Sequence, residues 1–175
     1  MINREEIKSL VGIVRESVTH VKKLVNKKIG KDVLALTQFR VFELRGKCCA
    51  YKKIFRDLII NEVFIAPRVS ISIFQIWHLW NNEASEKRVN DCKKLCTDFR
   101  QFAEFVVAHE VGHVIEYVTG IIKEHNTEQS QKYADDFALD LLDIVKKGWP
   151  HNCEVKKESE MIESITGNGW IKKEN

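Results

Sequence analysis

The residues with the clearest chemical potential form the run His109-Glu110-Val111-Gly112-His113, an HExxH sequence. On a helix, residues i and i+4 lie one turn apart on the same face, so the imidazoles of His109 and His113 can meet one metal ion. Glu110 is offset by one residue and can reach a water molecule held by that ion. Two histidine ligands beside a carboxylate base are typical of a zinc-dependent hydrolase, and Zn²⁺ is therefore the expected cofactor.

The residues around this run support a metal site. Apolar side chains precede it at Phe105–Ala108 and follow it at Val114, Ile115 and Val118, so the helix is apolar on almost every side. A helix of this kind is buried. Burying an unpaired carboxylate costs several kcal/mol, and an unsatisfied imidazole costs roughly 1–3 kcal/mol. A divalent metal would satisfy these polar groups together, whereas the alternative is a buried hydrogen-bond network without metal.

The third zinc ligand has to come from another part of the chain, because catalytic zinc sites keep three protein ligands and one open position. The metzincin extension is absent, since the third and sixth positions after the second histidine are not glycine and histidine. The best candidates lie on the next predicted helix, where Glu128, Gln131 and Asp135 share one face. Small residues at Ala134 and Ala138 predict that this helix approaches the HExxH helix closely.

The HExxH run and the segment that follows it together resemble the ImmA/IrrE type of gluzincin peptidase. In that family a helical E-x-x-A-(N/D)-x-F-A segment follows HExxH. Its Glu is the third zinc ligand, and its Asn or Asp orients a zinc-binding histidine. Residues 131–138 are Gln-Lys-Tyr-Ala-Asp-Asp-Phe-Ala, which fits this pattern at every position except the first. The resemblance covers about Phe102 to Leu142, after which Asp143-Ile144-Val145 replaces the usual Met-Pro.

The most important difference from the family pattern is Gln131, which stands at the position of the ligand Glu. A neutral amide is a poor zinc ligand compared with a carboxylate, so the identity of the third ligand is open. Three arrangements follow. In the one that we favour, Asp135 becomes the ligand and Gln131 orients it. In the second, Asp136 or Glu128 is the ligand. In the third, the site binds metal weakly and the protein acts by binding a partner.

Glu110 and Tyr117 are the expected catalytic residues. Glu110 would deprotonate the attacking water and later pass the proton to the leaving amine. Tyr117 follows the second histidine by four residues on the ligand face, where it can hydrogen-bond an oxyanion, although a core tyrosine has the same pattern. The prediction is a zinc metallopeptidase whose partner is a protein or peptide substrate.

The resemblance further implies limited proteolysis of a regulatory protein in the cytoplasm. Two alternatives remain open. One is a catalytically weak or inactive metallopeptidase-like protein that binds a partner through its first helix or a sheet edge. The other is a zinc hydrolase that does not cleave peptides, such as an amidase.

The elements that position these residues indicate one α+β domain over residues 1–175, of minimal zincin-like type. The apolar spacing predicts an amphipathic helix within residues 1–30, from Arg4 to about Lys28. Three strands of a small antiparallel sheet are expected at Leu34–Leu44, Cys48–Phe55 and Leu58–Ile65, with Pro67 ending the third. By resemblance, Leu58–Ile65 would bind the substrate backbone. Helices are expected at Ser70–Trp80, Glu86–Cys96, Gln101–Val118 and Thr127 to about Lys147, followed by a C-terminal extension, 148–175.

Composition limits the class of protein. The 175 residues are 44% hydrophobic and 30% charged, which is typical of a globular chain. The formal charge of +3 is too balanced to indicate nucleic-acid binding. No uncharged stretch is long enough to span a membrane, and charges near the start argue against a signal peptide. The 5 cysteines are an odd number without a secretion signal, so we expect reduced thiols in the cytoplasm.

Overall fold

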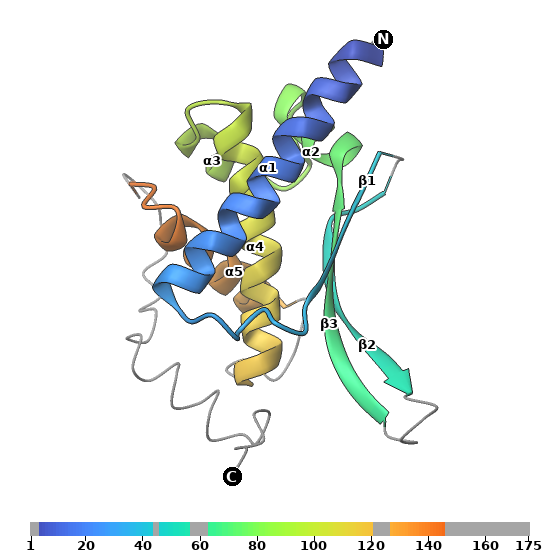
Figure 1. Cartoon of the computed structure of the whole chain (residues 1–175). Coiled ribbons are helices and arrows are strands. Elements are labelled where there is room, and N and C mark those ends of the chain that lie inside the picture. Colours follow the sequence, from blue (N-terminus) through green and yellow to red (C-terminus); the bar gives the residue numbers. More distant parts are fainter. Residues whose placement is uncertain (1–3, 44–45, 57–62, 121–126, 146–175) are drawn as a thin grey trace.

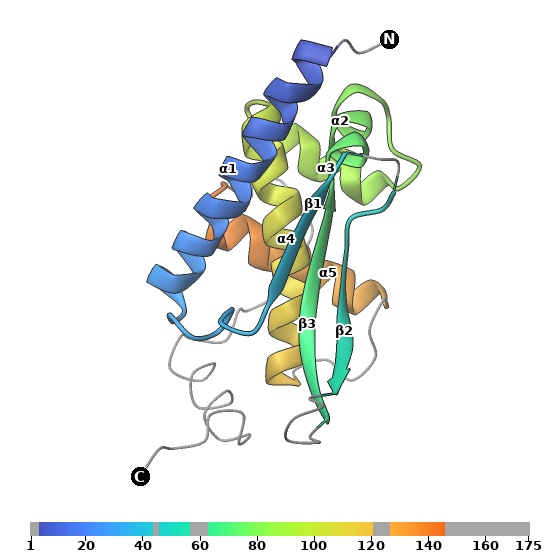
Figure 2. The ribbon, with the colours of Figure 1, turned by 45° about the vertical axis from the view of Figure 1, so that its right-hand side comes forward.

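The computed structural model describes residues 4–43, 46–56, 63–120 and 127–145, and the predicted C-terminal extension 148–175 lies outside them. A three-stranded sheet lies on one side of the central helix α4, and the long helix α1 lies on the other (Figure 1). Figure 2 shows α5 crossing close to α4. The elements are α1 (Arg4–Lys28), β1 (Gln38–Phe42), β2 (Cys49–Arg56), β3 (Val63–Ser72), α2 (Ile73–Asn81), α3 (Lys87–Leu95), α4 (Phe99–Thr119) and α5 (Glu128–Leu141).

Helix α1 confirms the predicted amphipathic helix, with the predicted bounds. Its buried apolar residues recur every three or four positions, at Val14, Val18, Val21 and Val25. This spacing places them on one stripe that packs against α4 in the common hydrophobic core. Helix α1 therefore covers the face of α4 that is turned away from the sheet.

The sheet is mixed, so the prediction of an antiparallel sheet was wrong in part. The strand order is β1-β3-β2, with β3 in the centre. Strand β2 pairs with β3 antiparallel, but β1 pairs with β3 parallel, from Gln38 opposite Arg68 to Phe42 opposite Ser72. Strands β1 and β2 are consecutive along the chain, yet they lie on opposite sides of β3. Order along the chain does not determine which strands pair.

Pro67 does not end the third strand, contrary to the prediction, because β3 continues through it to Ser72. A proline is tolerated in a strand where its missing N–H has no partner. Strand β1 pairs only with residues from Arg68 onward, so Pro67 lies just before the part of β3 that is paired on both sides. The following helix consequently begins at Ile73, later than predicted, and the Ser72 side chain caps it by accepting from the Gln75 N–H.

Helix α3 confirms the predicted helix to within one residue at each end. It is attached to the end of α2 through Lys93, whose ammonium donates to the carbonyls of Leu79, Trp80 and Asn82. A lysine at a helix C-terminus satisfies carbonyls that have no intrahelical partner. This attachment fixes the position of α3, and therefore of Arg88 in its first turn.

Helix α4 is buried around most of its circumference, as its all-round apolar pattern predicts. Asp98 caps its start by accepting from the Gln101 N–H at 2.8 Å. Gly120 ends it in the left-handed conformation, with φ 66°, which glycine adopts without steric cost. The HExxH run lies in the second half of this helix, at the level where α5 crosses it (Figure 2).

Helix α5 ends at Leu141, earlier than the predicted end near Lys147. Asp143 adopts a left-handed conformation with φ 55°, and the Ile144 N–H bonds the carbonyl of Leu139, which makes a Schellman-type end. Lys28 of α1 stabilises this end by donating to the Leu141 carbonyl and pairing with Asp143. Sequence reasoning missed this end, because an aspartate takes the role that glycine usually has.

The approach of α5 to α4 is as close as the small residues predict. A Cβ added to Gly112 would lie 2.9 Å from the Ala134 backbone, a distance that real Cβ atoms do not reach. Glycine at position 112 and alanine at position 134 therefore set the distance between the two helices that carry the candidate site.

We expect Gly112→Ala to lower the free energy of unfolding by about 1–2 kcal/mol, because α5 must move away from the new methyl group. Glycine to alanine in a helix otherwise stabilises, by about 0.5–1 kcal/mol. Gly12→Ala in α1 is the matched control, since an added Cβ there meets nothing within 4 Å. Urea unfolding of the variants checks this, and equal stabilisation by both substitutions would contradict it.

Candidate functional site

The two histidines of the HExxH run lie side by side on the face of α4 that α5 covers. Their ring centroids are 4.8 Å apart and the rings are nearly perpendicular, at 89°. His109 is 8% exposed and His113 is 7% exposed. The predicted one-turn spacing therefore does bring both imidazoles together, within a nearly closed environment.

Each histidine is oriented by a carboxylate at its Nδ1 atom. His109 Nδ1 lies 2.8 Å from Asp135 Oδ1, and His113 Nδ1 lies 2.6 Å from Glu116 Oε2. Ser130 donates a further hydrogen bond to the same oxygen of Glu116, at 2.8 Å. A carboxylate only accepts, so both Nδ1 atoms carry a proton, and in the neutral ring such a proton leaves the lone pair on Nε2. A histidine whose other nitrogen ligates a metal has this arrangement.

Burial and the neighbouring carboxylates act in opposite directions on the pKa of His109. Burial alone would lower this pKa, but the hydrogen bond to Asp135 and the charges of Asp135 and Glu110 raise it overall. The Nε2 atom of His109 has no hydrogen-bond partner among the described residues. In the neutral form of the ring, this nitrogen is available to bind a metal.

Glu110 is 7% exposed, and the N–H of Ala50 in β2 donates to its carboxylate. Burial raises the pKa of Glu110, and the nearby histidines and the Ala50 N–H offset part of this rise. A carboxylate with a raised pKa is a better proton acceptor than an exposed one, as general-base catalysis requires. Strand β2 therefore helps to position the predicted base.

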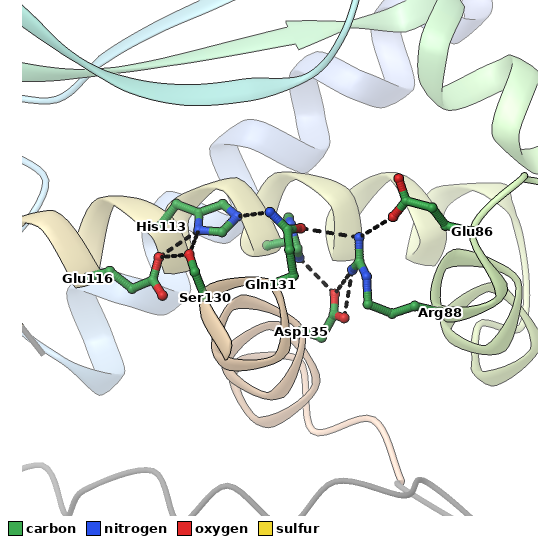
Figure 3. A network of polar contacts seen from close by, with 8 residues as sticks. Glu86, Arg88, His113, Glu116, Ser130, Gln131 and Asp135 are labelled. Carbon is green, nitrogen blue, oxygen red and sulfur yellow. Dashed lines mark hydrogen bonds and ion pairs between the residues drawn. The ribbon is translucent and has the colours of Figure 1, made fainter. Parts of the chain in front are cut away.

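Gln131 lies between the histidine pair and Arg88 of α3. Its Nε2 atom faces His113 Nε2 at 3.4 Å, and its Oε1 atom accepts from Arg88 Nη2 at 3.2 Å. The other guanidinium nitrogen of Arg88 donates to both Asp135 oxygens at 2.6 Å. Figure 3 shows the continuous network from Glu86 through Arg88 and Gln131 to His113.

The carboxylates predicted as alternatives for the third ligand lie in different environments. Asp135 is fully buried, and its oxygens contact His109 Nδ1 and Arg88, whereas its predicted role as the ligand stays a prediction. Asp136 is fully buried as well, and Glu128 is exposed in the first turn of α5. Within the described ranges, no group of three or more His, Cys, Asp or Glu side chains is arranged to hold a metal ion.

Tyr117 is half-buried next to β2. Its hydroxyl donates to the carbonyl of Ala50 at 3.2 Å, and burial raises the pKa of the phenol. Ala50 thus offers its N–H to Glu110 and its carbonyl to Tyr117. Among the described residues, its strand pairs only with β3. The predicted oxyanion role of Tyr117 stays a prediction.

The strand that is seen to contact the site, β2, is not the one that sequence reasoning favoured. The segment predicted to bind the substrate backbone, Leu58–Ile65, lies partly outside the described residues. Its described part belongs to β3, the central strand, where it pairs with β2. Strand β2 is an edge strand, and its Ala50 contacts the site directly.

Four contributors to the site were missed by sequence reasoning: Arg88, Glu116, Ser130 and the backbone of Ala50. Glu116 carries a usable signal, because it is an acidic residue three positions after His113 on a helix predicted to be buried. Ser130 is a polar residue four positions before Ala134, on the helix predicted to pack closely against α4, but a serine is a weaker indication of a site than a carboxylate. Arg88 has none, since its place at the site depends on how α3 packs.

No family model, curated protein or solved structure matches this chain. None of the helices in the described residues has the length and apolar character needed to cross a membrane. The functional assignment therefore depends on the chemistry of the site itself.

Proposed function

We propose that the protein is a zinc-dependent metallopeptidase. The observation that carries this proposal is the pair of histidines whose Nδ1 atoms are both held by carboxylates, Asp135 for His109 and Glu116 for His113. The two rings lie side by side, and both interact electrostatically with Glu110. Such second partners are a regular feature of zinc-binding histidines.

The residues present fit a divalent metal at two protein ligand positions, His109 and His113. A zinc ion bound there would supply the Lewis acidity that activates water and polarises a peptide carbonyl. Arg88 engages both Asp135 oxygens and His109 Nδ1 contacts one of them. This proposal therefore replaces the ligand role that we favoured for Asp135 with the orienting role that the ImmA/IrrE resemblance implies for this position. The third position is left to solvent and substrate, since the Gln131 NH₂ group faces His113.

In this proposal Glu110 carries out the proton transfers, and the backbone of Ala50 positions it. Glu110 accepts a proton from the attacking water and delivers it to the leaving amine, which its raised pKa favours. The Ala50 N–H holds the carboxylate in place during both transfers. The proposed substrate is a protein in the cytoplasm cut at few positions, and this part of the proposal rests on the resemblance alone.

Metal removal tests this function. We expect the purified protein with zinc to create new peptide termini in a cell lysate, to lose this activity after chelation, and to regain it when zinc is restored. Mass spectrometry of labelled termini measures the result. Termini that are unchanged by chelation would contradict the proposal, because a contaminating serine or cysteine protease behaves in that way.

A second function, partner binding without catalysis, is favoured by one observation. The amide of Gln131 stands where the resemblance places a ligand carboxylate, and its NH₂ group faces His113. A protein of this kind would capture a partner equally well with and without zinc. Zinc-independent capture together with the absence of new termini would favour this function over the first.

A further inference from the structure

The orientation of the Gln131 amide is determined by Arg88. A guanidinium has five N–H donors and no acceptor, so the end of the amide that faces it must be the carbonyl oxygen. Arg88 Nη2 lies 3.2 Å from this oxygen. The opposite end, the NH₂ group, therefore faces His113 Nε2 at 3.4 Å.

The contacts of His113 are compatible with the same orientation. Its Nδ1 atom faces Glu116 Oε2, and its Nε2 atom faces the Gln131 NH₂ group, which can donate to the neutral imidazole. The inverted amide would place its NH₂ group beside the guanidinium of Arg88, and this contact between two donors would be repulsive. The contact with Arg88 therefore fixes the orientation of the amide.

Arg88 is itself held firmly. One guanidinium nitrogen donates to both oxygens of the buried Asp135, and the other also donates to Glu86. Its side chain is 25% exposed. Burial works against the charge of Arg88, but Asp135 raises its pKa overall, so the guanidinium stays protonated.

We propose that the Arg88–Gln131 pair controls metal occupancy, because it turns an NH₂ group toward the histidines and leaves two protein ligands for zinc instead of three. This inference rests on the proposed function, since it concerns the same metal site. An NH₂ group has no lone pair to give to a metal, so zinc binding to the resting site is weak. Release of Gln131 by Arg88 would let the amide oxygen turn toward the metal.

The same geometry predicts what a carboxylate at position 131 would do. One oxygen of the new glutamate would accept from Arg88, and the other would occupy the place of the NH₂ group beside His113. Arg88 would then orient a third ligand toward the site. A single substitution, Gln131→Glu, is therefore expected to strengthen zinc binding.

Zinc affinity measured by competition with a fluorescent chelator tests the proposal on four full-length variants, with His113→Ala as the reference for a lost ligand. Gln131→Glu should bind zinc at least about tenfold more tightly than the natural chain, a change as large as outer partners of a metal site produce. Gln131→Ala should bind zinc as the natural chain does. Arg88→Lys, which retains a charge for Asp135 but not the planar fork, should bind more tightly. In Arg88→Lys/Gln131→Ala this gain should be absent.

The contradicting results are specific. A loss of zinc affinity in Gln131→Ala as large as in His113→Ala would show that Gln131 is already a ligand, and would overturn the proposal. An unchanged affinity in Gln131→Glu, in a chain that remains folded by circular dichroism, would overturn it too. If the natural chain and Gln131→Glu both bind zinc no better than His113→Ala, the metallopeptidase function itself fails.

Discussion

Glu110→Gln is expected to lower the kcat/KM for peptide cleavage by about 10²–10⁴-fold while zinc remains bound, because the amide cannot accept a proton from water. The substitution preserves size and the hydrogen bond from the Ala50 N–H, since the amide oxygen can accept it. Cleavage of a quenched fluorescent peptide library, with zinc content measured on the same samples, provides the test.

Glu104→Gln is the matched control for this experiment. Glu104 lies on the same helix and pairs with His20 at 2.9 Å, away from the histidine pair. Its replacement should leave cleavage within about twofold of the natural rate, since the amide oxygen can keep the contact with His20. Equal cleavage by Glu110→Gln and the natural chain would show that Glu110 is not the base.

Asp135→Ala is expected to lower the free energy of unfolding by about 3 kcal/mol, near the lower end of the cost of breaking a buried ion pair. The substitution leaves the guanidinium of Arg88 without its carboxylate and His109 without its partner at Nδ1. The cost stays near the lower end because Arg88 keeps Glu86 and Gln131. Zinc affinity should also fall by about 10–100-fold, because His109 is no longer oriented.

Asp140→Ala tests whether these losses are specific. Asp140 is an exposed aspartate on the same helix, so its substitution should change stability by no more than about 0.5 kcal/mol. Guanidinium chloride unfolding measures all three chains. Similar stability of the Asp135 and Asp140 variants would mean that the network around Arg88 does not contribute to the fold.

The parts of the site that could be predicted are those formed by residues close to one another in the sequence. The helical spacing of His109 and His113 and the small residues on α5 correctly predicted paired imidazoles under a closely packed second helix. The residues that complete the network depend on tertiary packing. Arg88 contacts Asp135 from 47 positions away, and no periodicity reveals such a contact.

The fold shows the same limit. Amphipathic spacing and capping residues correctly predicted α1, α3 and α4 to within a few residues. The parallel pairing of β1 with β3 could not be predicted, because alternating side chains indicate a strand without indicating its neighbour. The end of α5 was missed because Lys28, more than 100 positions away, stabilises it together with Asp143.

Equilibrium dialysis against zinc tests the central claim, that His109 and His113 hold a catalytic metal, most directly. The natural chain is predicted to bind one zinc ion, and a folded His109→Ala/His113→Ala chain is predicted to bind none under the same conditions. The natural chain binding no more zinc than the double variant would contradict the account.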